Sequence, residues 1–228
     1  MVNGRLTSVV ELAKRVIAGE VSRSSARFVV GIAGPPGAGK STLAGDLRDQ
    51  INLLVGKGHA EIAPMDGFHF TNVALEASGR LDRKGELDTF DVNAYVRLLR
   101  TLRYTRAGSI PWPTFDREKH DPIPGGVVFV EQTTVVITEG NYLLIDGLAG
   151  WSSVRANLDE AWYLDASKDV IEDRLFQRQI AGGKSVVDAR NKVFLSDIPN
   201  SELIADTKHR ADVVLRERGG HYYIERGS

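Results

Sequence analysis

The sequence predicts a three-layer α/β fold, in which helices cover both faces of a central parallel sheet. Short apolar runs rich in β-branched residues alternate with amphipathic stretches along the chain. The first of these runs passes through a glycine-rich turn directly into a helical stretch. No internal repeat, low-complexity linker or change in composition marks a boundary, so we expect residues 1–228 to form one domain.

The expected strands are apolar runs, and the expected helices carry apolar residues at helical spacing. We expect strands at 27–33, 60–65, 127–130, 134–138, 160–164, 213–215 and 222–224. We expect helices at about 1–20, 41–54, 92–103, 168–180 and 186–195. The polar, glycine-bearing stretch 71–88 is expected to lie on the surface, within a longer excursion over about 66–125. The three tryptophans are expected in the core or in a pocket wall, with Trp162 in the core.

The amino-acid composition limits which binding partners and which cellular compartment we expect. The 29 Lys and Arg residues nearly balance the 30 Asp and Glu residues, for a net charge of -1, so neither a nucleic-acid track nor an anionic membrane surface is indicated. The absence of cysteine excludes disulfides and thiolate chemistry. No apolar run approaches the length of a membrane span, and the first 20 residues have an amphipathic pattern. We therefore expect a cytoplasmic protein without nucleic-acid or membrane partners.

The turn after the first strand carries a phosphate-binding pattern. Residues 34–41 fit G-x-x-x-x-G-K-[ST] in full, with a strand before them and a helix after them. Glycines let successive backbone N–H groups point into one concavity, and the helix N-terminus adds positive potential. Lys40 is expected to reach the β- and γ-phosphates, and the Ser41 hydroxyl to bind Mg²⁺. The candidate nucleotide-binding residues are Gly34, Pro35, Pro36, Gly37, Ala38, Gly39, Lys40, Ser41 and Thr42. The alternative is an ordinary turn.

This pattern predicts a P-loop NTPase fold, and other motifs decide among the reactions that such a fold supports. The guanine-reading Asn-Lys-x-Asp motif is absent, because Asn191-Lys192 continues with Val-Phe. The Leu-Ser-Gly-Gly-Gln signature of transporters is also absent. A second Gly-Lys-Ser, at 183–185, has Arg178 where the first glycine of the pattern belongs, and no strand precedes it. A kinase is the class that remains.

Two carboxylates lie where strands of the predicted sheet end. Asp66 follows the 60–65 strand, and Glu139 follows the 134–138 strand. Ligands of open α/β sheets bind beyond the carboxyl ends of the strands. Phosphoryl transfer uses one carboxylate to orient or deprotonate the acceptor hydroxyl and another to hold Mg²⁺ or its waters. Because glycine follows each of them, a turn-forming or capping role is the alternative.

These motifs together resemble the superfamily of uridine kinases, phosphoribulokinases and bacterial pantothenate kinases. Residues 34–41, 65–70 and 139–144 occur in the order and approximate spacing of that superfamily, over about 28–215. The resemblance implies a kinase fold of the nucleoside or sugar kinase type. It also implies that Asp66 is the catalytic base and that Glu139 serves the magnesium ion.

The motifs resemble different branches of the superfamily. The Asp-Gly-Phe-His block at 66–69 is most similar to pantothenate kinases. The Pro-Thr-Phe-Asp-Arg segment at 113–117, with His120, is closer to uridine kinases. Among subgroups, the chain most resembles small proteins described as candidate fructose-transport-system or sugar kinases.

Two polar clusters with embedded aromatic residues, 84–91 and 115–121, are expected beside the acceptor. Such segments can hydrogen-bond a polyhydroxylated molecule while a ring forms an apolar wall. The candidate acceptor-binding residues are Asp66, His69, Lys84, Phe115, Arg117, His120, Glu139 and Tyr142. Solvated surface loops are the alternative for the two clusters, and a structural role is the alternative for His69.

A helix with two arginines on one face is the candidate lid, over about 174–195. Arg174 and Arg178 are four residues apart, and the helix runs into Gly182-Gly183-Lys184, a candidate hinge. In related kinases such a lid brings arginines onto the transferring phosphoryl group. This sequence lacks the Arg-Gly-Arg run of many uridine kinase lids. A surface helix with salt bridges to neighbouring acidic residues is the alternative.

The sequence thus predicts a kinase that uses ATP and Mg²⁺ to phosphorylate a hydroxyl of a small metabolite. The candidate catalytic residues are Asp66, Lys40, Arg174 and Arg178, and the candidate metal ligands are Ser41 and Glu139. A sugar or sugar-derived alcohol is the expected acceptor, and uridine, another nucleoside or pantothenate is the alternative. A nucleotide-binding regulatory ATPase is the alternative of another class. A homodimer is compatible with the sequence.

Overall fold

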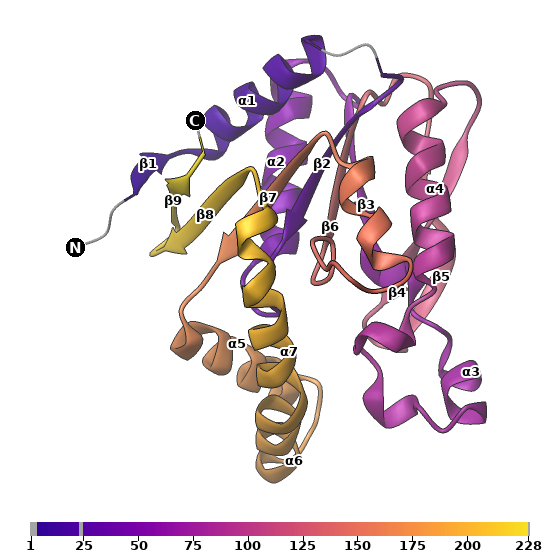
Figure 1. Ribbon diagram of the computed structural model, residues 1–228, viewed down its shortest axis with the longest axis vertical. Coiled ribbons are helices and arrows are strands. Elements are labelled where there is room, and N and C mark those ends of the chain that lie inside the picture. The colour runs from indigo at the N-terminus through magenta and orange to yellow at the C-terminus, as the bar shows by residue number, and fades with distance from the viewer. Residues whose placement is uncertain (1–3, 23–24, 228) are drawn as a thin grey trace.

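The computed structural model describes residues 4–22 and 25–227, and its centre is a seven-stranded sheet (Figure 1). The strand order is β1-β9-β8-β7-β2-β6-β3. These strands are β1 Arg5–Thr7, β2 Phe28–Ala33, β3 Ala60–Pro64, β6 Val135–Gly140, β7 Glu160–Asp165, β8 Val213–Arg218 and β9 His221–Arg226. The five strands from β8 to β3 pair in parallel, whereas β9 and β1 add antiparallel strands at one edge. The predicted parallel core is confirmed.

Helices cover both faces of this sheet, as predicted (Figure 1). The helices are α1 Val9–Val21, α2 Lys40–Leu54, α3 Asn72–Ala77, α4 Val92–Tyr104, α5 Lys168–Ala181, α6 Val186–Lys192 and α7 Ile198–Ala205. Apolar side chains of α1 and α2 pack on one face, and those of α4 and α7 pack on the other. Every residue of β2 and β6 is buried, as expected for parallel strands covered on both sides. Trp112, Trp151 and Trp162 are buried in this interior.

The amino-terminal part differs from the single helix expected over 1–20. Residues 1–3 of that range lie outside the described residues. Arg5–Thr7 form β1, which pairs with β9, and α1 begins only after Ser8. Ser8 accepts a hydrogen bond from the Glu11 backbone N–H, while the Glu11 side chain accepts one from the Ser8 N–H, a reciprocal capping box. The helix therefore starts where its first N–H groups find side-chain partners, after a strand too short to give a periodic signal.

The segment 110–129 forms a separate two-stranded antiparallel hairpin of β4 Ile110–Asp116 and β5 Asp121–Phe129. From sequence, only 127–130 was expected as a strand, and 115–121 was expected as a polar loop. The prolines in both strands obscured the pattern, since proline is tolerated in strands only at edges and irregularities. The hairpin packs against the turn after β3, where a Cβ on Gly67 would lie 2.0 Å from the Pro113 carbonyl oxygen. The hairpin thereby sits beside the ends of the central strands.

The expected helix 186–195 is part of a longer helical rod. It starts as α6, widens into a π-helical turn at Val193–Asp197, and continues as α7. The expected surface excursion 71–88 contains α3 and 3₁₀ turns at Leu81–Arg83 and Leu87–Thr89. Within residues 4–22 and 25–227, no helix has the length and apolar character needed to span a bilayer.

Candidate active site

A cavity of about 1120 Å³ lies at the carboxyl ends of β2, β3 and β6. The P-loop residues 36–42 form part of its lining. Residues 66, 69 and 84 line it beside α3, and residues from β1 and the β8–β9 turn line its other end. The volume suffices for a nucleotide and a small second molecule together, since ligand pockets commonly span about 300–1,000 Å³.

The P-loop backbone adopts conformations that favour glycine. Gly37 and Gly39 have φ values of 82° and 96°, in the left-handed region. A Cβ on Gly34 would lie 2.4 Å from the Leu164 carbonyl oxygen, so this position also excludes a side chain. α2 begins at Lys40, and among the described residues no side chain caps its first turn. The loop N–H groups are thus available to an anion at a helix N-terminus.

The Lys40 side chain is held in place before any phosphate binds. Its Nζ donates hydrogen bonds to the Pro35 carbonyl at 2.9 Å and to Asn141 Oδ1 at 2.7 Å. It is only 7% exposed, and burial lowers its pKa to about 8 although the carboxylates of Glu139 and Asp66 oppose that shift. Sequence reasoning missed Asn141; its position two residues after Glu139, at the same strand end, was the available signal.

Ser41, in the first turn of α2, faces Glu139, near the end of β6. The Ser41 hydroxyl donates a 3.2 Å hydrogen bond to Glu139 Oε1. Glu139 is 7% exposed, and burial, reinforced by the nearby Asp66 charge, raises its pKa to about 7. A hydroxyl and a carboxylate are the hard oxygen ligands that Mg²⁺ prefers, and this ion commonly keeps waters and binds nucleotide phosphates. The pair therefore fits a magnesium ion delivered with a nucleotide.

Asp66 lines the same cavity as the P-loop. It belongs to the 3₁₀ turn Met65–Phe68, which directly follows β3, and it lines the cavity. Its charge acts on Lys40, Glu139 and His69, so these four side chains share one electrostatic environment. The close packing of Gly67 against the β4–β5 hairpin fixes this turn. The cavity thus holds a carboxylate in electrostatic range of the P-loop lysine, and further space beyond the P-loop lining.

Most of the predicted acceptor residues gather around that space. Asp66, His69, Lys84, Arg117, Glu139 and Tyr142 all line the cavity. The Arg117 charge acts on both Lys40 and Glu139. Tyr142 is buried, and its hydroxyl donates to the Gly85 carbonyl at 2.7 Å. This hydrogen bond joins the loop after β6 to the polar segment 84–91.

His69 forms part of an aromatic wall. Its ring stacks on Phe90 with centroids 3.9 Å apart and contacts Phe115 at 4.9 Å. Burial lowers its pKa to about 4, the opposing effect of Asp66 being smaller, so the ring is neutral near pH 7. Its Nδ1 is buried and has no hydrogen-bond partner among the described residues. The ring thus offers a polar atom within an apolar wall.

The structure places two predicted acceptor residues outside the cavity lining. Phe115 packs against His69 and lies 5.4 Å from Lys84 Nζ, so it supports the wall rather than forming its surface. His120 lies in the tight turn of the β4–β5 hairpin with φ 52°, and its carbonyl accepts a 2.6 Å hydrogen bond from Lys84. The turn geometry points to a structural position for His120, which spacing along the sequence did not reveal.

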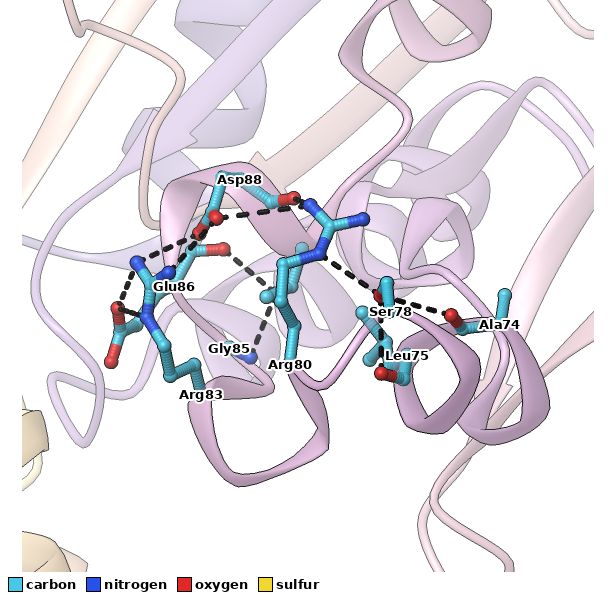
Figure 2. Close-up of polar contacts among 9 residues, drawn as sticks. Ala74, Leu75, Ser78, Arg80, Arg83, Gly85, Glu86 and Asp88 are labelled. Carbon is cyan, nitrogen blue, oxygen red and sulfur yellow. Dashed lines mark hydrogen bonds and ion pairs between the residues drawn. The ribbon is translucent and has the colours of Figure 1, made fainter.

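The acceptor-side segment is held together by its own polar contacts. Figure 2 shows Arg83 bonded to Glu86 and Asp88, and Arg80 bonded to Ser78 and the Asp88 backbone. These pairs are largely exposed, and each exposed pair contributes at most about 1 kcal/mol. Together with α3, these contacts fix the path of this polar segment beside the cavity.

The two candidate lid arginines occupy different positions. Arg174 donates to the Gly37 carbonyl at 3.2 Å and pairs with Glu217 at 2.7 Å, on the carbonyl side of the P-loop. Both arginines line the cavity, and the charge of Arg178 lowers the pKa of Lys40. Glu172 pairs with Lys168 along α5, whereas Arg174 pairs with Glu217 of β8 rather than with the neighbouring acidic residues of the surface-helix alternative. From sequence, both arginines are candidate catalytic residues, and which lid cation contacts the phosphates stays open; among the described residues, Arg174 bonds a P-loop carbonyl and Arg178 does not.

Comparison with known proteins identifies the relatives of the chain. Residues 29–221 match the phosphoribulokinase / uridine kinase family. The protein YggC of Escherichia coli K12 is 32% identical over 199 residues, covering 86% of this chain and 81% of YggC. A pantothenate kinase of Limosilactobacillus reuteri is 28% identical, covering 91% and 76% of the two chains.

A solved structure agrees with this assignment. The crystal structure of a candidate fructose transport system kinase from Silicibacter sp. TM1040 superposes with a TM-score of 0.82 at 32% identity. The match covers 91% of this chain and 98% of that chain. Kinases of this family use ATP; the family name covers phosphoribulokinases and uridine kinases, and the relatives of the chain include pantothenate kinases. The chain therefore belongs to the phosphoribulokinase / uridine kinase family of small-molecule kinases.

Proposed function

We propose that this kinase transfers the γ-phosphate of ATP to a hydroxyl of a sugar or sugar-derived alcohol. The observation that supports it best is the convergence of Lys40, the Ser41–Glu139 pair and Asp66 on one cavity. A phosphate-binding loop, a metal-binding pair and a carboxylate facing the remaining space are the parts that phosphoryl transfer to an alcohol requires.

The P-loop and its lysine bind the nucleotide phosphates. Backbone N–H groups of the loop and the N-terminus of α2 receive the anion, and Lys40 reaches the β- and γ-phosphates. Ser41 and Glu139 would hold a magnesium ion bound with the nucleotide, and this ion would supply positive charge against the phosphate oxygens. Arg174 supports the loop from its carbonyl side, so it acts as a positioning residue rather than as a catalytic one.

Asp66 is the proposed base. Its carboxylate accepts the acceptor's hydroxyl proton as the new O–P bond forms and the bond from the γ-phosphorus to the bridging oxygen breaks. ADP then leaves with that oxygen. Arg178, on the lid segment over about 174–195, neutralises the developing charge, and closure of the lid excludes water that would otherwise hydrolyse ATP.

Nucleosides and pantothenate are the second candidate acceptors, because uridine kinases and pantothenate kinases are among the named relatives. A regulatory ATPase is the candidate of another class, but the acceptor-side wall of His69, Lys84 and Arg117 would have no role in it. We place the reaction in the cytoplasm, with one small-molecule acceptor as partner; a homodimer stays a prediction.

A coupled ADP-release screen tests the proposal. The purified protein is incubated with ATP and Mg²⁺ and with sugars, sugar alcohols, nucleosides or pantothenate. One acceptor that raises ADP release at least about tenfold above the water background supports the kinase. Slow release that no acceptor changes would favour the regulatory ATPase.

A further inference from the structure

The active-site cavity extends past the P-loop in both directions along the sheet edge. β2, which leads into the P-loop, has β6 and β3 on one side and β7, β8, β9 and β1 on the other. Asp66 and Glu139 line the cavity on the β6–β3 side. The opposite end, here the β1–β9 end, is lined by residues 6–9, 11, 217 and 220–222. The proposed phosphoryl transfer leaves this end without a ligand.

The strand directions bring β1 and β9 to the P-loop edge of the sheet (Figure 1). β1 pairs antiparallel with β9, β9 pairs antiparallel with β8, and β8, β7 and β2 pair in parallel. β1 therefore runs in the direction of β2, and its last residue, Thr7, lies at the edge where β2 enters the P-loop. β9 runs the other way, so its first residues, His221 and Tyr222, lie at the same edge.

Hydrogen bonds of the P-loop indicate how a bound triphosphate is oriented. Lys40, which reaches the β- and γ-phosphates in the proposed function, is bonded to Asn141 after β6. Ser41 is bonded to Glu139 near the end of β6. The γ-phosphate therefore lies toward β6 and β3. Because the nucleoside is attached at the other end of the triphosphate, it lies across the P-loop, toward the β1–β9 end.

The charges at the β1–β9 end disfavour a phosphate group there. Glu11 and Glu217 line this end, and Asp46 of α2 also lines the cavity. The Arg174 guanidinium is paired with Glu217 at 2.7 Å. Carboxylates repel a phosphate but accept hydrogen bonds from hydroxyl groups. The β1–β9 end therefore suits the uncharged part of a nucleotide.

Two polar groups at this end are available to a ligand. Asp46 is exposed and has no hydrogen-bond or ion-pair partner among residues 4–22 and 25–227. Tyr222 is 9% exposed, and its phenol has no hydrogen-bond partner in the described part of the chain. Burial, and then the charges of Asp46 and Glu217, raise the pKa of this phenol against the effect of Arg174, as expected for neighbouring groups. Both residues line the cavity, so a ligand there can bond to them.

The position of Asp46 on α2 matches that of a ribose. Asp46 follows Thr42 by four residues, so both lie on one face of α2, about 6 Å apart along the helix axis. Thr42 is the last residue of the phosphate-binding segment, and the ribose is the next group of a nucleotide after the α-phosphate. Leu6 of β1 is 57% exposed and lines the cavity, so a base packed on it would bury apolar surface.

We infer that the nucleoside of ATP occupies the β1–β9 end, where Asp46 accepts a hydrogen bond from a ribose hydroxyl and the base packs against Leu6. This inference rests on the proposed function for the position of the triphosphate. It makes β1 and the start of α1 part of the nucleotide site. Both elements precede the residues that match the family, so family membership alone gives them no role.

The first test compares ATP with inorganic tripolyphosphate, which has the phosphates but no nucleoside. Dissociation constants for both are measured with Mg²⁺ by isothermal titration calorimetry, without an acceptor. Asp46→Ala should weaken ATP binding about fivefold or more, since a hydrogen bond to a charged group is lost, and should leave tripolyphosphate binding unchanged or tighter. The control Asp49→Ala removes an exposed carboxylate of α2 outside the cavity lining, and should leave both constants within about twofold.

Equal changes for ATP and tripolyphosphate in Asp46→Ala, or tighter binding of ATP, would overturn the inference. It would also fail if the wild type bound ATP no more tightly than tripolyphosphate, because the nucleoside would then make no contact. The titration needs no turnover. A lack of acceptor-stimulated ADP release, which would contradict the proposed function, is therefore distinguishable from failure of this inference.

The second test examines the ribose contact. 2′-Deoxy-ATP and 3′-deoxy-ATP are titrated into the wild type and into Asp46→Ala. One of them should bind the wild type more weakly than ATP yet lose little more in the variant, since both changes remove the same hydrogen bond. Strictly additive losses for both analogues would contradict the contact.

The third test examines the base contact. Leu6→Ala should weaken ATP binding about threefold or more without weakening tripolyphosphate binding, because apolar contact with the base is lost. Leu53→Ala is the matched control, since Leu53 is 78% exposed on α2 and does not line the cavity. Equal effects of the two variants would overturn the base contact. Thermal unfolding checks that each variant retains the fold.

Discussion

Lys40 and Asn141 are joined by a 2.7 Å hydrogen bond from Nζ to Oδ1. Lys40 begins the helix after β2, and Asn141 follows β6, so the parallel pairing of β2 with β6 brings the two residues together. The Pro35 carbonyl accepts a second bond from the same ammonium group. The charge is thus oriented before the nucleotide arrives, and no reorganisation is needed when it binds.

Asn141→Ala should lower kcat/KM for ATP about tenfold, because losing one hydrogen bond to a charged group frees the Lys40 side chain. Steady-state kinetics with varied ATP measures this. Asn93→Ala is the matched control, since Asn93 is exposed on α4 and does not line the active-site cavity. Unchanged kinetics in Asn141→Ala would show that the bond does not orient the lysine.

Asp66→Asn should lower kcat by about 10²–10⁴, the usual contribution of a general base. The dissociation constant of ATP should change little, because Asp66 is assigned to the acceptor. Turnover assays and a fluorescent-nucleotide titration measure the two effects. Asp49→Asn, an exposed carboxylate on α2, is the control. If turnover survives, the base must be reassigned, with Asp116 as the next candidate.

The pH profile of kcat/KM for ATP should be bell-shaped. Burial raises the pKa of Glu139 to about 7, and this group must be ionised to bind magnesium, so activity falls as the pH drops below that value. Burial lowers the pKa of Lys40 to about 8, and this group must be protonated, so activity falls again above it. Profiles of kcat/KM report groups of the free enzyme. A profile that is flat between about pH 6 and pH 9 would contradict these assignments.

The two arginines of α5 should give different kinetic defects. Arg178→Ala should lower kcat about 10²-fold, because it removes a charge that stabilises the transition state. Arg174→Ala should mainly raise KM for ATP, because the Gly37 carbonyl loses its support. Glu217→Gln should act in the same direction as Arg174→Ala, since Glu217 holds that guanidinium at 2.7 Å. The reverse pattern would make Arg174 the catalytic arginine.

The sequence predicts those parts of the protein that local chemistry determines. The P-loop is set by glycines and their flanking strand and helix within a short segment; residues 36–42 line the cavity as expected, whereas Gly34 and Pro35 do not. The strand-end positions of Asp66 and Glu139 follow from the parallel sheet, which brings strand ends to one edge. The parallel core could be predicted because β2 and β6 are buried and rich in β-branched apolar residues.

Other features depend on contacts between distant segments, and sequence patterns do not encode these. Arg174 and Arg178 share a helix face, but Glu217 on β8 decides that Arg174 turns to the loop backbone. Asp197 is carried into the cavity by a π-helical turn that has no sequence signature here. The prolines of the β4–β5 hairpin prevented its strands from being predicted from sequence. The packing of the hairpin on Gly67 determines where His120 lies.

Transfer of the γ-phosphate itself is the most direct test of the proposed function. The wild-type protein is incubated with γ-³²P-labelled ATP, Mg²⁺ and the acceptor that most stimulates ADP release, and the products are separated and identified by ³¹P NMR. The proposal predicts that one phosphate monoester of the acceptor forms for each ADP released. It also predicts that Lys40→Ala forms neither product at a rate comparable to that of the wild type. Label found only in inorganic phosphate, whatever the acceptor, would contradict the proposal and leave an ATPase.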